Sequence, residues 1–325
     1  MPTAGPGEVL VQIQAVSLNF RDVAIPTGRH PLQHSPGLIP TSDAAGVIVG
    51  VGDGVSDFQR GDRVLSTYHP RWVGGRPPSS MTSDAYGRGR DGWLTEYKAV
   101  SQQSVVLVPS SLASHSACTL PCAGVTAWSA LRGPDPLRSG QWVLTMGTGG
   151  VSLFALQLAK ASGLQVVATT SSPQKAEFLK ALGASHVVNY SAERSWGLSA
   201  RELTGGRGFD RIVEVGGAGT MAQSLLAIKE FSEIALVGFL DHSAQSIDFG
   251  DLFRSNANIR QVRVGHRQQL EEVVEVVNAH DIKPVIDAVF PFEVAPAAFR
   301  HLDAARPVGK VVIEISPDPG PEAGM

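Results

Sequence analysis

The 325-residue chain has little cysteine, with only Cys118 and Cys122, and few charged residues, which make up 18% of it. Two cysteines are too few for a disulfide framework or a structural zinc cage. The net charge of -3 gives no electrostatic reason to expect a nucleic acid or an anionic membrane as partner. No apolar run approaches the ~20 residues of a membrane span, and the first residues do not resemble a signal peptide. We therefore expect a cytoplasmic, globular, two-domain protein that acts on a small molecule.

The most informative stretch is 141–152, where an apolar, strand-like segment ends at a cluster of glycines. An apolar helical pattern follows at once. A strand, a glycine turn and a helix are the start of a dinucleotide-binding Rossmann unit, because only glycine lets a pyrophosphate approach the backbone at a helix N-terminus. Ser152 stands where the fingerprint has its third glycine, and serine is small enough to keep the helix close to the strand.

The segments after this turn alternate in type. Strands are expected at 164–170, 186–190, 211–215, 234–238 and 259–265, and helices at 173–182, 192–203, 221–228 and 268–278. This alternation predicts a parallel, doubly wound sheet.

The remaining segments predict a second domain of short strands. Strands at 9–16, 44–51, 93–100 and 104–108 favour a partly closed β-barrel, and helices are expected at 112–120, 124–131 and 293–302, with a last strand at 309–315. The stretch 69–92 is rich in Gly, Pro, Ser and Arg and is predicted to be a surface loop.

The coenzyme can be predicted from the end of the second Rossmann strand. A site for NAD usually places Asp or Glu about 20 residues past the first glycine, where it binds the ribose 2′-hydroxyl. Ser171, Ser172 and Lys175 stand in that region instead. Hydroxyls and a lysine suit a 2′-phosphate, which a carboxylate would repel, so the sequence favours NADPH. Ser171, Ser172 and Pro173 are also suited to cap the helix that follows.

Short motifs run the length of the chain. They are GPGEVLV at 5–11, NFRD at 19–22, GDRV at 61–64, LPCAGVTAW at 120–128, GTGGVS at 147–152, LGA at 182–184, VNY at 188–190, TGGRGFD at 204–210, VEVGG at 213–217 and GKVV at 309–312. Together they resemble the medium-chain dehydrogenase/reductase superfamily, in its zinc-free quinone oxidoreductase-like and zinc-type alcohol dehydrogenase-like branch.

The resemblance implies an α/β fold. A GroES-like, partly closed β-barrel domain (1–115 and 281–325) would surround an inserted Rossmann domain (116–280), with hydride transfer from NAD(P)H in the cleft between them. Family members usually carry further strands before the segment that starts here at Gly5. Either this chain has lost those strands or this sequence starts late, and an uncovered sheet edge is expected.

The resemblance also bears on metal binding. Zinc alcohol dehydrogenases of this family place Cys, His and Cys on a catalytic metal, and the matching positions here are Asn19, Ser42 and Cys122. A catalytic zinc needs three protein ligands and an open position, and only one of these residues is a usual ligand, so no metal site is predicted. Cys122 is expected to be a buried thiol beside the nicotinamide rather than a nucleophile.

Hydride addition builds negative charge on oxygen, which without zinc needs other donors. Asn19, at the family's active-site position, is the best candidate. Arg21 is a second candidate, although it is more often ion-paired with Asp22, and Tyr68 could donate a proton. The resemblance places Thr126 against the nicotinamide, whereas Trp93 could line the substrate site or belong to the core.

The predicted coenzyme contacts lie on the glycine turn and on later loops. They are Thr126, Gly147, Thr148, Gly149, Gly150, Val151, Ser152, Ser171, Ser172, Lys175, Tyr190, Val215, Gly216, Gly238, Phe239, Leu240, Val264, Gly309 and Lys310.

The sequence therefore predicts a zinc-independent, NADPH-dependent oxidoreductase that reduces a conjugated alkene (enone or enoyl), a quinone or a carbonyl compound. A metal-free alcohol dehydrogenase and a non-catalytic, crystallin-like NADPH-binding protein remain alternatives. The resemblance further implies a homodimer in which the last Rossmann strands, 234–237 and 259–264, join across a two-fold axis.

Overall fold

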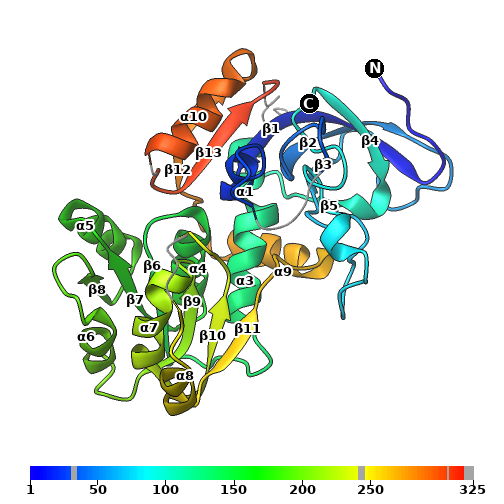
Figure 1. The fold of residues 1–325 in the computed structure, drawn as a ribbon. Coiled ribbons are helices and arrows are strands. Elements are labelled where there is room, and N and C mark those ends of the chain that lie inside the picture. The colour runs from blue at the N-terminus through cyan, green and yellow to red at the C-terminus, as the bar shows by residue number, and fades with distance from the viewer. Residues whose placement is uncertain (31–34, 241–245, 306, 318–325) are drawn as a thin grey trace. The chain divides into compact units, whose positions relative to one another are not determined.

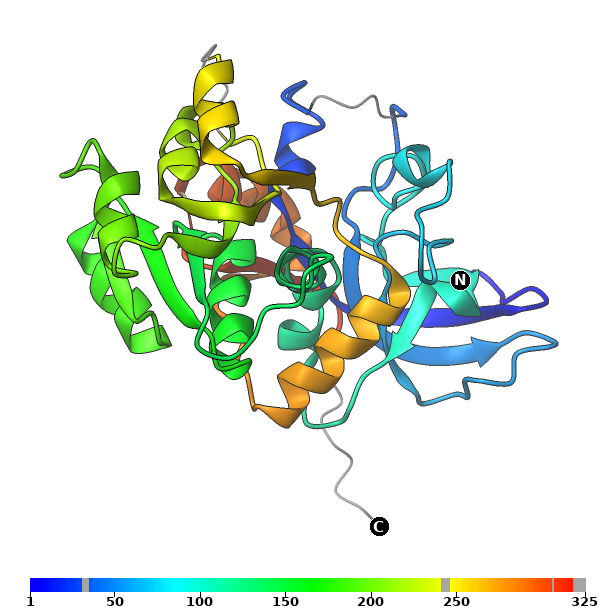
Figure 2. The ribbon, with the colours of Figure 1, turned by 90° about the horizontal axis from the view of Figure 1, so that it is seen from below.

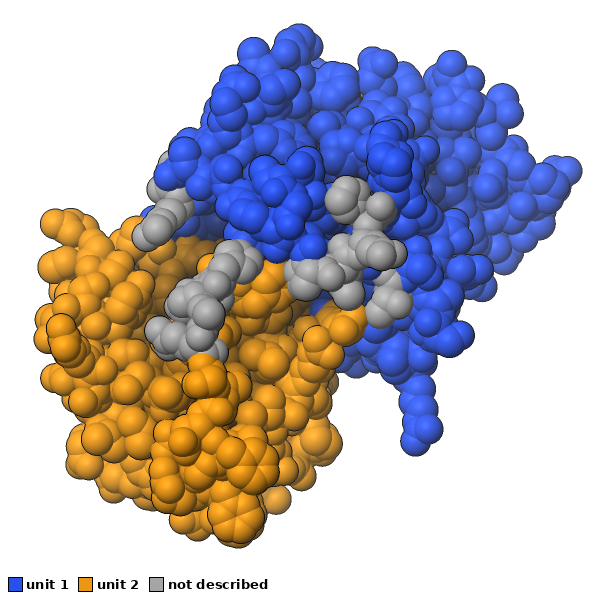
Figure 3. Space-filling view, in the orientation of Figure 1, with its two compact units in different colours: residues 1–125, 264–325 blue, residues 126–263 orange. Residues whose placement is uncertain are grey.

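The structure is a computed structural model that describes residues 1–30, 35–240, 246–305 and 307–317 (Figure 1). It divides into two compact units, residues 1–125 with 264–325 (unit 1) and residues 126–263 (unit 2) (Figure 3). Unit 2 is one uninterrupted segment. The division expected from the sequence instead assigns residues 116–125 and 264–280 to the Rossmann domain. Helix α9 (Arg267–Ala279) packs on residues of unit 1, namely β5 (Val105–Leu107) and the helical segment Leu120–Gly124.

Unit 1 is built on a seven-stranded sheet within the described residues. Its strands lie in the order β12 (Ile286–Pro291), β13 (Lys310–Glu314), β1 (Glu8–Leu18), β2 (Asp43–Val51), β3 (Arg63–Ser66) and β5, and β4 (Tyr97–Ser101) also pairs with β1. The predicted β-rich domain is thus confirmed, and its last strand joins the first. Strand β12 was not predicted.

Strand β1 is buried along most of its length, although its alternating sequence predicts one buried face. The reason is that it is paired on both edges: β2 takes one edge, and β4 and β13 share the other. Figure 2 shows β1 and β2 side by side. The register pairs Ser17 with Asp43 and Leu18 with Val311, so the end of β1 lies beside the starts of β2 and β13.

The helices of unit 1 are short, apart from α9 and α10 (Ala295–Ala305); the others are α1 (Phe20–Ala24) and α2 (Ser114–Ala117). Single helical turns lie at Met81–Ser83, Gln102–Ser104 and Phe292–Val294. The predicted helix at 112–120 is wrong in extent. A separate helical segment begins at Leu120, with Pro121 in its first turn, because a proline lacks the N–H that would continue the helix before it.

The stretch 69–92 is mostly irregular, with many exposed residues, as predicted for a surface loop, but part of it is buried. His69, Asp84 and Tyr86 are buried, and the Tyr86 ring meets the edge of the Trp93 ring at a centroid distance of 5.3 Å. Trp93 is 1% exposed and belongs to the core of unit 1, which decides between its two predicted roles. The composition of this stretch therefore predicted the loop but not its buried contacts.

Unit 2 confirms the predicted doubly wound sheet. Six parallel strands lie in the order β11 (Asn258–Gln261), β10 (Ile228–Leu236), β9 (Phe209–Glu214), β6 (Trp142–Met146), β7 (Gln165–Thr170) and β8 (His186–Asn189). This is the Rossmann order, in which the chain reverses direction across the sheet between β6 and β9.

The helices of unit 2 lie between its strands along the chain, apart from α3, which precedes the first strand. They are α3 (Val125–Leu131), which begins at the unit boundary, α4 (Gly150–Ala161), α5 (Pro173–Leu182), α6 (Trp196–Glu202), α7 (Ala218–Ala227) and α8 (Phe249–Ser255). Helix α5 has the predicted bounds, whereas α8 was not predicted. In the part of the chain that the structure describes, no helix is long and apolar enough to cross a membrane.

A buried charge network ties three strands of unit 2 to the end of α3. Arg211, 1% exposed, donates to the carbonyl oxygens of Ala130 and Leu131 and lies 3.2 Å from Glu233 Oε1. Arg260 binds the same carboxylate through two hydrogen bonds, at 2.9 and 3.0 Å. One carboxylate therefore compensates two guanidinium groups.

Replacing Glu233 by Gln should destabilise the protein strongly, since it leaves two guanidinium groups without their counter-charge. Removing one partner of a buried ion pair costs about 3–5 kcal/mol. Glu177→Gln is the matched control, because Glu177 pairs with Lys180 on the surface and such pairs contribute about 1 kcal/mol or less. Thermal and urea unfolding of both variants would measure the difference, and equal stabilities would contradict the assignment.

Candidate functional site

Three polar side chains, two of them buried, meet where β1 ends and β2 and β13 begin. Asn19 Nδ2 donates to Asp43 Oδ2 at 2.9 Å, and Lys310 Nζ donates to Asn19 Oδ1 and, at 2.6 Å, to the carbonyl oxygen of Leu18. Lys310 Nζ also lies 3.9 Å from Asp43 Oδ2. Asp43 is fully buried and Lys310 is 3% exposed. We call Asn19, Asp43 and Lys310 the polar cluster.

The Asp43 carboxylate is the centre of this cluster. Its Oδ1 accepts from the Ser42 hydroxyl at 2.6 Å, and its Oδ2 also accepts from the backbone N–H of Cys122 at 3.2 Å. Burial raises the pKa of Asp43, while Lys310 acts in the opposite direction. Burial also raises the pKa of the Cys122 thiol, so that this sulfur is a neutral group rather than a thiolate nucleophile.

Two further predicted residues lie together in unit 1. The Arg21 guanidinium lies 4.8 Å from the centroid of the Tyr68 ring and donates to the carbonyl oxygen of Tyr86 at 2.9 Å. Burial raises the pKa of Tyr68 to about 12, so its phenol keeps its proton at neutral pH. Asp22, expected to pair with Arg21, accepts a hydrogen bond from the Asn19 backbone N–H at 2.8 Å, and burial raises its pKa to about 6.

The glycine turn of unit 2 has the features of a pyrophosphate site. Gly147 has φ +73°, and a Cβ added at Gly147 or Gly149 would meet no atom within 4 Å, so this backbone borders open space. The twelve-residue helix α4 begins there without a side-chain cap. Ser152 is buried and donates to the carbonyl oxygen of Met146 at 2.6 Å, which fastens α4 to the end of β6. The turn therefore fits a dinucleotide phosphate.

Glu214, at the end of β9, organises the next loop and was missed by the sequence analysis. It is fully buried and accepts from the backbone N–H groups of Gly216 and Gly217, at 2.8 and 3.0 Å, and from the hydroxyls of Thr220 and Ser224. An acidic residue that ends an apolar strand before two glycines is a signal that could have revealed it.

Two predicted coenzyme loops lie side by side. The N–H of Gly238 donates to the carbonyl oxygen of Glu214 at 3.1 Å. The N–H of Leu240 donates to the carbonyl oxygen of Val215 at 3.3 Å. The structure thus brings Val215 and Gly216 together with the segment that contains Phe239.

The residues predicted to bind the 2′-phosphate follow β7 and β8. Ser172 caps α5, since its hydroxyl accepts from the Lys175 N–H at 3.4 Å, as its position predicted. Thr170 pairs with Asn189, which brings Ser171 and Tyr190 to the same edge of the sheet. Ser171 is exposed, Lys175 is half-buried and Tyr190 is 44% exposed.

The remaining predicted residues fall in different places. Thr126 is buried in α3, within unit 2, whereas Val264, Gly309 and Lys310 belong to unit 1. Gly309 has φ +96°, and a Cβ there would collide with the carbonyl oxygen of Val285. Lys310, predicted as a coenzyme contact, directs its ammonium group into the polar cluster.

Comparison with known proteins identifies the family. A family model described as an alcohol dehydrogenase GroES-like domain matches residues 5–110, and one described as a zinc-binding dehydrogenase matches residues 150–279. A zinc-type alcohol dehydrogenase-like protein of Schizosaccharomyces pombe is 39% identical over 95% of this chain and 91% of its own length. The chain belongs to the medium-chain dehydrogenase/reductase superfamily, and it is an oxidoreductase of that superfamily.

Further members of the superfamily span most of the chain. The 2-methylene-furan-3-one reductase of Solanum lycopersicum is 31% identical over 98% of this chain and 74% of its own length. A candidate alcohol dehydrogenase from Sinorhizobium meliloti 1021 is 41% identical, with a TM-score of 0.89 over 97% of this chain and 93% of that one.

Two other solved structures are an NAD-dependent alcohol dehydrogenase and a mycobacterial protein complexed with NADPH. The first is 30% identical, with a TM-score of 0.87 and coverage of 97% and 94%. The second is 25% identical, with a TM-score of 0.79 and coverage of 97% and 93%.

The zinc of some superfamily members does not fit the residues of this chain. At the matching positions, Asn19 Oδ1 accepts from Lys310, the Ser42 hydroxyl donates to Asp43, and Cys122 is held as a neutral thiol. Zinc prefers thiolate, imidazole and carboxylate ligands, and the Lys310 ammonium already supplies the positive charge beside Asp43. Across the described residues, no group of three or more His, Cys, Asp and Glu could hold a metal ion.

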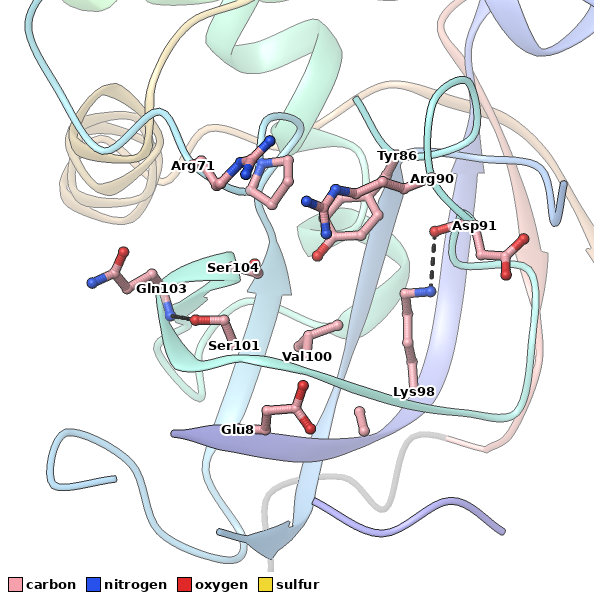
Figure 4. A pocket seen from close by; sticks show the side chains of 12 residues that line it. Glu8, Arg71, Tyr86, Arg90, Asp91, Lys98, Val100, Ser101, Gln103 and Ser104 are labelled. Atoms are coloured by element: carbon pink, nitrogen blue, oxygen red, sulfur yellow. Dashed lines mark hydrogen bonds between the residues drawn. The ribbon is translucent and has the colours of Figure 1, made fainter. Parts of the chain in front are cut away.

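Unit 1 also contains a cavity of about 500 Å³ that none of the polar cluster lines (Figure 4). Arg71 and Arg90 both pair with Asp84 beside it, and Lys98 Nζ donates to the carbonyl oxygen of Asp91 at 3.0 Å. The cavity borders β4, which pairs with β1 and with no second strand in the described ranges.

Proposed function

We propose that this protein is a zinc-independent, NADPH-dependent reductase of conjugated alkenes, quinones or carbonyl compounds. The observation that carries the proposal is the polar cluster, in which an amide fixed by Lys310 and Asp43 stands at the position of a zinc ligand. The glycine turn, with its open backbone at an uncapped helix N-terminus, supports binding of a dinucleotide.

The residues of the chain would act by positioning and by charge stabilisation. Bound NADPH would supply the hydride, and negative charge would then develop on the substrate oxygen. The Asn19 amide has a second N–H beyond the one that Asp43 accepts, and we assign this N–H to the substrate oxygen. After hydride transfer, the substrate carbon or oxygen would need a proton. Tyr68, whose pKa is about 12, is protonated at neutral pH and could donate it.

The names of relatives support two kinds of reaction, the reduction of a conjugated alkene and the oxidation of an alcohol. The tomato relative is named as a reductase of a methylene-furanone, a conjugated alkene, which favours reduction. Several relatives are named alcohol dehydrogenases, so metal-free alcohol oxidation is the second candidate.

An assay with enones, quinones, aldehydes and alcohols separates the candidates. We expect NADPH oxidation with at least one enone or quinone, and no loss of turnover after treatment with a chelator. Stoichiometric zinc that is lost together with activity would contradict zinc independence. Oxidation of alcohols alone would favour the second candidate, and tight NADPH binding without turnover would favour a binding protein.

The coenzyme preference is tested by Lys175→Ala. A charge-assisted hydrogen bond contributes about 1.5–3 kcal/mol, so loss of one phosphate contact should weaken NADPH binding by about 10- to 150-fold. NADH, which has no 2′-phosphate, should bind as before. Lys180→Ala is the matched control, because Lys180 lies on the same helix and pairs with Glu177. An unchanged Michaelis constant for NADPH, or a wild type that prefers NADH, would refute the assignment.

We also propose a homodimer that forms through the edge strand of unit 2. Strand β11 is the last strand of its sheet, and its Ile259 side chain is 38% exposed. Phe249 and Phe253 of α8 are each 77% exposed, which is unusual for two aromatic side chains four residues apart. Light scattering at micromolar concentration should give the mass of a dimer, and a monomeric mass would contradict the proposal.

A further inference from the structure

The neighbours of Asn19 determine which way its amide points. A lysine ammonium can only donate hydrogen bonds, and an ionised carboxylate can only accept them. The Asn19 oxygen therefore belongs beside Lys310 Nζ and its nitrogen beside Asp43 Oδ2, which is the arrangement observed. The two ends of an amide are usually hard to tell apart, but here the charged partners leave one orientation.

Both charged partners are themselves held in place. Lys310 Nζ also donates to the carbonyl oxygen of Leu18, and Asp43 accepts from the Ser42 hydroxyl and the Cys122 N–H. A flipped amide would bring its oxygen against the carboxylate and its N–H groups against the ammonium. Because Asp43 and Lys310 are buried, water would screen these two repulsive contacts poorly.

We propose that Lys310 and Asp43 are positioning residues that lock the Asn19 amide, so that its second N–H is presented as the donor to the substrate oxygen. This inference rests on the proposed function, since it assumes that a substrate oxygen is the acceptor. It assigns Lys310 a role other than the coenzyme contact that the sequence predicted. The lysine and the carboxylate act through Asn19 and need not touch the substrate.

The lock depends on both charges being present. Without the ammonium group, the buried Asp43 carboxylate would lose its counter-charge and would favour the protonated form. A protonated carboxyl group can donate as well as accept, and it could therefore pair with either end of the amide. Both orientations of Asn19 would then be populated, and the flipped one presents an oxygen where a donor is needed.

The first test uses Lys310→Met, which removes the charge from a side chain of similar shape. Loss of one oxyanion donor lowers kcat by about 10²–10³-fold, and we expect Lys310→Met to approach this loss with little change in the KM for NADPH. Lys310→Arg, which keeps a charged donor, should restore part of kcat. Lys283→Met, at an exposed lysine of unit 1, is the control and should behave as wild type.

The double variant Lys310→Met with Asp43→Asn separates positioning from stability. It leaves no unpaired charge in the core, so its thermal stability should recover relative to Lys310→Met. Its kcat should stay low, because neutral partners do not fix the amide. If kcat recovers together with stability, the two residues have only a structural role and the proposal fails.

A readout without turnover keeps this test independent of the proposed function. The NMR signals of the Asn19 side-chain amide can be assigned by their loss in Asn19→Asp. One pair of amide protons is expected in the wild type, and broadened or doubled signals in Lys310→Met. A single, unchanged pair in Lys310→Met would refute the lock. A lock seen by NMR in a protein that reduces none of the substrates would instead refute the proposed function.

Discussion

The pairing of β1 on both edges is the constraint on which the candidate site depends. With β2 on one edge and β13 on the other, residues from the two ends of the chain become neighbours at the end of one strand. A shift of one residue in either register would turn the side chains of that strand to the opposite face. The polar cluster of Asn19, Asp43 and Lys310 forms only because β1 pairs in these registers with both β2 and β13.

Buried carboxylates recur in both units, and three of them are compensated by several partners. Asp43 has the Lys310 ammonium and three hydrogen-bond donors, and Glu233 has two guanidinium groups. Glu214 accepts from two backbone N–H groups and two hydroxyls. Carboxylates without such partners would be too costly to bury, whereas compensated ones fix loops and side chains in a single arrangement.

The fold was largely predictable from the sequence because its signals are local. The glycine turn, the apolar strands of unit 2 and helix α5 each follow from the residues of one short segment, and the structure has them where expected. Predictions failed where a segment has the composition of an exposed loop but some of its side chains are buried. The stretch 69–92 has the composition of a surface loop, but Tyr86 packs on Trp93, and no local pattern indicates that contact.

The sequence by itself determined the Rossmann unit and a β-rich second domain, because strand and helix periodicities and glycine turns depend on neighbouring residues. Its resemblance to a family added the GroES-like fold and the residue types at the site. Only the tertiary structure decided which of those residues contact one another. Lys310 and Asn19 are 291 positions apart, and their contact exists because β13 returns to pair with β1. The buried partners of Asp43, the loop around Glu214 and the core place of Trp93 depend likewise on segments that are distant in the chain, since hydrogen bonding and packing act on neighbours in space.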